Sequence, residues 1–210
     1  MSLIELVAAP DPDRDAIRAF LDGMSHAERV HATRSLPRTL FPVLYDMLAG
    51  GAPVTLNDMV PEGSEPFRVV RHHGINSLLM FRVFQKPMYR NNDGVICGRN
   101  VQFWAWLTGH GYFTVRVYDE GDPEREVVVD YINLPAEKPE GWPTIHHNAR
   151  GLSYFVYRDT NDVMRQVSEH VTIGKALRNG KPIGAYFILV REDPEAALAG
   201  GETKALPAAS

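Results

Sequence analysis

The chain has 210 residues, of which 44% are apolar and 23% charged, with a formal net charge of −4 at pH 7. This composition is ordinary for a globular protein and excludes a disordered or collagen-like chain. The negative charge argues against nucleic acid as a main partner, and no apolar run reaches the roughly 18 residues that a membrane span requires. The single cysteine, Cys97, cannot close a disulfide within the chain. We therefore expect one cytoplasmic domain over residues 1–210.

The N-terminal segment 12–50 is predicted to be helical. Apolar residues recur at helical spacing in 17–21, and Ser25 with Glu28 has the form of a capping box. Pro37 is suited to open a further helix, which is predicted to end at the Gly-Gly pair that closes the segment. Short amphipathic helices need a surface to cover. We expect them to pack on the rest of the chain or to dock a protein partner.

After a turn-rich connector at 52–66, the apolar period changes from the helical value to the alternation that is typical of strands. Asn, Asp and Gly residues at the breaks supply the conformations that tight hairpins need. Strands are predicted near 67–72, 77–90, 95–107, 111–119, 126–132, 152–157, 169–178 and 183–191. One or two helical turns are predicted at 160–167, and a disordered tail at 192–210.

Consecutive strands joined by short turns predict a meander. The expected fold is α+β, with the N-terminal helices packed on an antiparallel β-barrel or strongly curled meander sheet over 67–191. A small barrel of about eight strands has an interior that can hold one small ligand. The sequence therefore favours a ligand pocket inside the sheet.

The end of the chain adds a resemblance. The segment from Asp162 to Arg191 contains Ile173-Gly174-Lys175, a glycine-bearing turn and Tyr186-Phe187-Ile188-Leu189. It resembles the closing hairpin of small bacterial lipocalin-like proteins. The resemblance implies a calycin-type barrel with an apolar ligand, and it carries over no catalytic residue.

Strand parity predicts which side chains share a face. The face that holds Phe113 is expected to be aliphatic core, and the opposite face is aromatic with a few polar atoms, as small-molecule sites are. On the last two strands, parity is expected to group Val171, Ile173, Phe187 and Leu189. The predicted ligand-binding residues are Trp104, Trp106, Tyr112, Thr114, Arg116, Tyr118, Asp130, His170 and Tyr186. The alternative is that this mixed face is the outside of the sheet, covered by helices or by water.

Arg116 and Asp130 are expected to lie opposite each other across two strands, where unlike charges attract. An exposed pair of this kind is structural and contributes little. In a buried pocket, the guanidinium would instead hold a carboxylate or phosphate. Both interpretations remain open at this point.

Catalytic and metal motifs are sparse. The chain has eight histidines but no metal-ligand spacing, and a site built from His73, His147 and His170 is the weak alternative to the prediction of no metal. No phosphate loop or dinucleotide glycine pattern occurs, so no cofactor is expected. A histidine paired with Asp130 or Tyr112 would provide acid–base chemistry.

The predicted function is binding of a small, largely apolar ligand inside the barrel. If Arg116 holds a carboxylate or phosphate, the ligand is also anionic. The alternative is a cofactor-independent enzyme, an isomerase, lyase or cyclase, using histidine, aspartate and tyrosine side chains in the same pocket.

Overall fold

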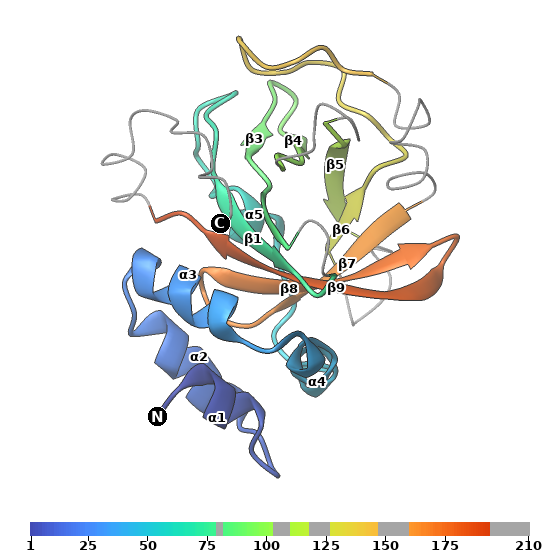
Figure 1. The fold of residues 1–210 in the computed structure, drawn as a ribbon. Helices are drawn as coiled ribbons and strands as arrows, with labels where there is room; N and C mark the ends of the chain where they lie inside the picture. Colours follow the sequence, from blue (N-terminus) through green and yellow to red (C-terminus); the bar gives the residue numbers. More distant parts are fainter. Residues whose placement is uncertain (79–81, 103–109, 118–126, 147–159, 194–210) are drawn as a thin grey trace.

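The computed structural model of the protein describes residues 1–78, 82–102, 110–117, 127–146 and 160–193 (Figure 1). Short helices form the N-terminal part, and a strongly curled antiparallel sheet forms the rest. This is the α+β architecture predicted from the sequence. None of the helices in these ranges is long and apolar enough to cross a membrane.

The helices all precede the sheet in the chain. They are α1 (Leu3–Val7), α2 (Arg14–Asp22), α3 (His26–Ser35), the 3-10 turn η1 (Arg38–Leu40), α4 (Phe41–Met47) and α5 (Leu56–Met59). The predicted capping box is confirmed, since the Glu28 amide donates to Ser25 Oγ and the Ser25 amide donates to Glu28 Oε2 at 2.8 Å. Helices α1 and α5 fall outside the predicted segment because five and four residues are too few to show a helical period.

Nine strands are present among the described residues. They are β1 (His72–Asn76), β2 (Val83–Gln85), β3 (Met88–Arg90), β4 (Ile96–Arg99), β5 (Tyr112–Val117), β6 (Val127–Asp130), β7 (Thr160–Gln166), β8 (Val171–Arg178) and β9 (Lys181–Arg191). Their order in the sheet is β2-β1-β9-β8-β7-β6-β5-β4-β3, and every neighbouring pair is antiparallel. From β3 to β9 the sheet is the predicted meander.

Two strand predictions were wrong. Residues 160–167 were predicted as helical turns, but β7 occupies them, because polar side chains at Thr160 and Asp162 hide the alternation of an inward-facing strand. A strand was predicted at 67–72 and a break between 72 and 77, but β1 occupies His72–Asn76, and before it only Val70 forms an isolated bridge. The predicted strand at 152–157 and most of the predicted tail lie outside the described residues.

The segment 83–90 joins the two ends of the sheet order, because it contains both β2 and β3. On one side it pairs with β1, where His73 lies opposite Gln85. Val70 pairs with Met88 in the same register, through mutual amide-to-carbonyl bonds of 2.7 and 2.9 Å. This ladder therefore continues past the end of β2.

The other side of the same segment pairs with β4, where Met88 lies opposite Gly98. Gln85 pairs with Val101 in the same register, through two bonds of 2.8 Å. The two ends of the curled sheet therefore meet along this one segment, which is interrupted as a strand only at Lys86 and Pro87.

Helices α1 to α4 cover the outer face of the sheet at β1, β8 and β9 (Figure 1). Ile173 and Ile188 are cross-strand neighbours on β8 and β9, and both pack against side chains of α1 to α4. The parity prediction that grouped Ile173 with Phe187 and Leu189 was wrong, because the register places Ile173 opposite Ile188 instead. Phe187 and Leu189 face the interior of the curl.

The interior holds a second apolar cluster. Its strand members come from both ends of the sheet order, so they lie on the concave side: Phe84, Met88, Ile96, Phe113, Val115, Val127, Val129, Tyr131, Met164, Phe187 and Leu189. Val54, Met59 and Val60 join the same cluster from α5 and its flanks. Residues that point into this interior are the ones able to form an enclosed site.

Candidate functional site

Lys86 is a charged residue among the apolar side chains of the interior. Side chains alternate along a strand, and Phe84 and Met88, two residues to either side, both belong to the inner cluster. Lys86 has the same parity, and only 2% of its side chain is exposed. The alternation of this segment therefore places the lysine inside the curled sheet.

The partner of Lys86 is Asp162 on β7. The Lys86 ammonium donates to Asp162 Oδ2 over 2.7 Å, and the aspartate side chain is 7% exposed. Burying either charge alone would be costly, so each group depends on the other. The contact is a buried ion pair across the interior.

Aromatic rings surround the lysine head group. Its Nζ lies 4.2 Å from the ring centre of Phe187, 5.3 Å from that of Tyr131 and 5.4 Å from that of Phe113. The face of an aromatic ring attracts a cation, and the attraction is larger where water is excluded. The rings therefore favour a positive charge at this position.

Each of the three inner phenylalanines lies directly opposite a glycine on the neighbouring strand. These cross-strand pairs are Gly74–Phe84, Gly98–Phe113 and Gly174–Phe187. A Cβ on Gly174 would lie 2.2 Å from Phe187 Cζ, well inside any allowed contact. The glycines therefore leave the space that the rings occupy, including the two phenylalanine rings beside Lys86.

Burial shifts the pKa of the Lys86 ammonium below its ordinary value. Removal from water disfavours the charged form, while the Asp162 carboxylate acts in the opposite direction through its charge and its hydrogen bond. The desolvation effect is the larger one. The Lys86 amine is therefore easier to deprotonate than a lysine on the surface.

A cavity of about 120 Å³ adjoins the ion pair. Its lining is mainly apolar, with the rings of Phe84, Tyr131 and Phe187 and the small side chains of Ala176 and Ala185. Its polar lining residues are Asn76, Lys86, Asn100, Gln102, Thr160 and Asp162. A mainly apolar cavity with a few converging polar groups is the usual form of a small-molecule site.

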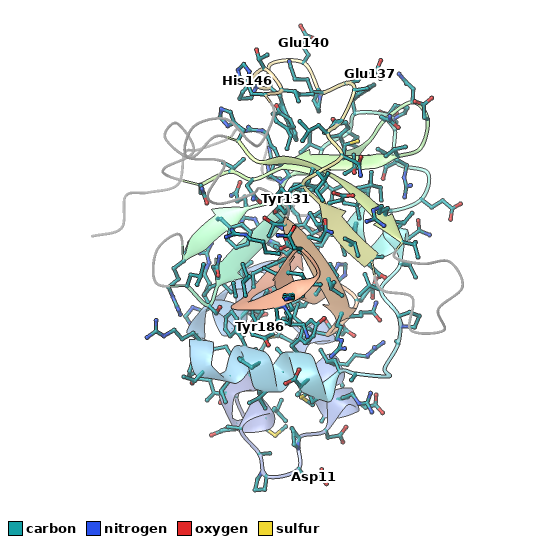
Figure 2. All side chains as sticks on the ribbon, turned by 90° about the vertical axis from the view of Figure 1, so that its right-hand side faces the viewer. Asp11, Tyr131, Glu137, Glu140, His146 and Tyr186 are labelled. Carbon is teal, nitrogen blue, oxygen red and sulfur yellow. The ribbon has the colours of Figure 1, made fainter. Side chains whose placement is uncertain are left out.

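Asn100 and Tyr131 provide a second polar position in the cavity. The Asn100 amide nitrogen donates to the Tyr131 hydroxyl over 3.1 Å. Asn100 is 7% exposed, and its Oδ1 has no hydrogen-bond partner among the described residues. Figure 2 shows Tyr131 near the middle of the molecule. A buried acceptor without a partner is costly, so this oxygen suits a donor group of a ligand or of an ordered water.

Four of the predicted site residues lie on the opposite, outer face of the sheet: Tyr112, Thr114, Arg116 and Asp130. The Tyr112 hydroxyl donates to the Pro143 carbonyl over 2.6 Å, and Thr114 Oγ1 donates to the Asn133 carbonyl over 3.1 Å. These contacts fasten the 131–146 loop to the sheet. The aromatic, polar face is therefore the outside, which was the alternative interpretation of the parity pattern.

The predicted ion pair of Arg116 and Asp130 is confirmed, with Arg116 Nε 3.0 Å from Asp130 Oδ2. The two residues are diagonal neighbours and not opposite each other as predicted, because the register pairs Asp130 with Thr114 and Arg116 with Val128. Arg116 is 45% exposed at its side chain, whereas Asp130 is 1% exposed. Asp130 also accepts from the amides of Ile132 and Asn133 and from the Asn133 side chain. Burial raises the pKa of this carboxyl, but these hydrogen bonds outweigh burial and hold it below its ordinary value. The pair thus stabilises the turn after β6.

The last two described candidates lie apart from the cavity. Tyr186 packs edge-on against Tyr45 of α4, with ring centres 5.6 Å apart, between the sheet and the helices (Figure 2). His170 is on the turn between β7 and β8, and its Nδ1 lies 3.4 Å from Asp193 Oδ1, after the end of β9. Trp104, Trp106 and Tyr118 lie outside the described residues.

Sequence reasoning missed the residues around the cavity, although their positions carried a signal. Lys86 has the parity of Phe84 and Met88, and Asp162 has the parity of Met164. A charge on the apolar face of one strand is an anomaly. Two opposite charges on the apolar faces of two strands indicate a buried pair.

The described residues contain no group of three His, Cys, Asp or Glu side chains that could hold a metal ion. His73 faces the ring of His26 at 5.1 Å, and burial is the main cause that lowers its pKa to about 4. His170 lies next to Asp193, as described above, and His147 is outside the described ranges. The three histidines of the alternative metal site are thus not seen together.

A larger hollow of about 630 Å³ lies outside the sheet, beside the start of α2. Three of its charged residues already serve the fold: Asp13 caps α2, Arg14 donates to the Ala49 carbonyl, and Arg18 donates to Gln166. The interior cavity is the candidate site because its charged residues, Lys86 and Asp162, are buried beside it.

Comparison of the chain with models of protein families, with curated proteins and with solved structures found no match.

Proposed function

We propose that the protein binds a small molecule in the interior cavity, with an apolar body against the aromatic rings and one polar group at Lys86. The observation that carries the proposal is a buried lysine that donates to one carboxylate and borders a mainly apolar cavity. An ammonium group has three donors. Among the described residues, Lys86 Nζ donates one hydrogen bond, to Asp162. A carbonyl, hydroxyl or carboxylate oxygen of a ligand can therefore accept from its other N–H groups.

The lipocalin-like interpretation belongs with this proposal. A curled antiparallel sheet with a cavity on its inner side is the arrangement in which such barrels hold a ligand. The docking of a protein partner by the 12–50 segment and a cytoplasmic location remain predictions from the sequence. The buried faces of α2 and α4 pack against the sheet.

Benzyl alcohol, benzoate and benzylamine test the proposal, because they share one ring and differ in the polar group. We expect benzyl alcohol or benzoate to bind, and benzylamine to bind more weakly because its ammonium would meet that of Lys86. Binding is measured by isothermal titration calorimetry and by shifts in the protein NMR spectrum.

The matched control for this test is a pair of alanine substitutions. Ala176→Leu fills the cavity that Ala176 lines, whereas Ala52→Leu adds the same atoms at an exposed position. Binding should be lost in the first variant and kept in the second. Equal affinities in both variants, or no binding of any of the three compounds to the unmodified protein, would reject the interior cavity as the site.

A second candidate function is acid–base catalysis in the same cavity. It is favoured by the pairing of Lys86, whose pKa is lowered by burial, with Asp162 at 2.7 Å, because pairs of this kind cluster at catalytic sites. The titratable side chains that line the cavity are those of Lys86, Asp162 and Tyr131. Deuterium exchange at the carbon next to the carbonyl of phenylacetaldehyde, compared between the protein and its Lys86→Met variant, tests this function.

A further inference from the structure

Resting on the proposed function, we infer that Lys86 forms a covalent imine with small aldehydes or ketones that enter the interior cavity. The ligand class is a carbonyl compound with a compact apolar body. The inference depends on three features of the site: a buried lysine that borders the cavity, an acid in contact with its amine, and rings that favour a cation at the nitrogen.

Imine formation requires a neutral amine, and the site supplies the group that accepts the proton. The proton passes from Lys86 Nζ to Asp162 Oδ2, which lie 2.7 Å apart. Burial favours this transfer, since it lowers the pKa of the Lys86 ammonium. Because the transfer turns two buried charges into two neutral groups, it also removes part of the desolvation penalty.

The reaction then balances with these two residues and water. The amine lone pair attacks the carbonyl carbon, and the proton on Asp162 moves to the carbonyl oxygen, which gives a carbinolamine. The carbinolamine nitrogen still carries two hydrogens and a positive charge; loss of the hydroxyl group with one of these hydrogens releases one water and leaves a protonated carbon–nitrogen double bond. A protonated imine has the same charge as the original ammonium, so the Asp162 carboxylate is its counterion at the end as at the start.

The rings stabilise the product as they stabilise the free lysine. Phe187, Tyr131 and Phe113 lie 4.2–5.4 Å from Nζ, within the range over which a cation is attracted to a ring face. Asn100 Oδ1, a buried acceptor of the same cavity, can accept from the hydroxyl of the carbinolamine.

The other described lysines lack this combination. Lys175 lies over the ring of Tyr45 on the helix-covered face and is half-buried, Lys181 is exposed at the start of β9, and Lys138 is half-buried in the 131–146 loop. Neither Lys175 nor Lys181 lines the interior cavity. Lys181 and Lys175 are therefore internal controls in the same chain.

The experiment treats the full chain with benzaldehyde and sodium cyanoborohydride at neutral pH, which reduces an imine to a stable benzyl-amine. Peptide mapping by mass spectrometry then compares labelling of Lys86, Lys175 and Lys181. We expect Lys86 to be labelled several-fold faster than either of the others, and benzyl alcohol to slow its labelling without affecting that of Lys181. Labelling of Lys181 ahead of Lys86 would overturn the inference.

Two further measurements keep this inference separate from the proposed function. Lys86→Arg retains a cation for Asp162 but cannot form an imine, so it should lose the Lys86 label while the labelling of Lys181 is unchanged. If benzyl alcohol binds and Lys86 is never labelled, the imine is rejected and the binding function stands. If neither benzyl alcohol nor benzaldehyde binds, both are rejected. The peptide map of the unmodified chain decides the question even where Lys86→Arg does not fold.

Discussion

Lys86 and Asp162 come from opposite walls of the curled sheet and meet in its interior. In the strand order, β1, β9 and β8 separate β2 from β7 in one direction, and β4, β5 and β6 separate β3 from β7 in the other. Lys86 lies between β2 and β3, so three strands separate it from Asp162 on either path, yet their charged atoms are 2.7 Å apart. The ion pair therefore ties opposite walls of the interior together.

The first prediction concerns the stability of this pair. Lys86→Met leaves the Asp162 carboxylate buried without a partner, so we expect a loss of about 3–5 kcal/mol in the free energy of unfolding. Lys86→Met combined with Asp162→Leu should recover much of the loss, because no uncompensated charge remains. Urea unfolding measures both, with Lys181→Met at an exposed position as the control. Additive losses in the double variant would show that the two side chains do not interact.

The second prediction concerns pH. His72 is buried, with Nδ1 3.2 Å from the Lys86 carbonyl, and burial, followed by the charge of Arg191, lowers its pKa from 6.5 to about 3. The folded protein thus binds fewer protons than the unfolded chain below pH 6.5, so stability is lost as the pH falls from 6.5 towards 3. By linkage the loss from this residue is about 3 kcal/mol at pH 4.5.

Urea unfolding between pH 7 and pH 4.5 tests the pH prediction. His72→Asn keeps a side-chain donor for the Lys86 carbonyl but has no titrating group, so its stability should fall less steeply than that of the unmodified protein. His31→Asn at an exposed position of α3 is the matched control and should leave the slope unchanged. Parallel slopes for the unmodified protein and His72→Asn would contradict the prediction.

The third prediction distinguishes the two partners of the outer ion pair. Asp130→Asn replaces a buried acceptor of several hydrogen bonds, including that of the Ile132 amide at 2.8 Å, and should cost about 1–3 kcal/mol. Arg116→Gln removes a half-exposed partner and should cost about 1 kcal/mol or less. Thermal melts of both variants test this order. A larger loss from Arg116→Gln would show that the guanidinium, and not the turn, determines the stability here.

The fourth prediction concerns the glycine behind Phe187. In Gly174→Ala the new Cβ would lie 2.2 Å from Phe187 Cζ and 2.8 Å from Met164 Sδ, so the ring must move. We expect a loss of about 1–3 kcal/mol, the usual cost of overpacking, together with weaker binding of benzyl alcohol. Gly23→Ala is the control, since a Cβ there meets only the Ala19 carbonyl oxygen closely, at 3.3 Å. Unchanged binding in Gly174→Ala would show that the position of Phe187 is not needed for the site.

Local signals were enough to predict several parts of this fold. The capping box of Ser25 and Glu28 depends on residues three apart, and the pairing of Arg116 with Asp130 depends on one hairpin. The alternation of apolar residues indicated most of the strands that the structure describes. Each of these features is determined by neighbours in the sequence.

The candidate site could not be predicted in the same way, because it depends on the curl of the whole sheet. Parity divides each strand into two faces but does not say which face is concave. Ile173 was assigned to the wrong group because a parity pattern cannot be carried from one strand to the next without the register. Lys86 and Asp162 lie 76 positions apart in the sequence, and only the curl brings them together.

The junction along 83–90 has a consequence for the behaviour of the protein in concentrated solution. An open sheet ends in strands whose free amide and carbonyl groups can pair with another molecule, which is a common route to aggregation. Here the backbone of Gln85 pairs with both His73 and Val101, and that of Met88 pairs with both Val70 and Gly98. The segment that would form both borders of the sheet is thus occupied on its two sides. A substitution that broke the backbone pairing along 83–90 would expose two unpaired sheet edges at once. The protein would then self-associate under the same conditions in which its interior cavity opens.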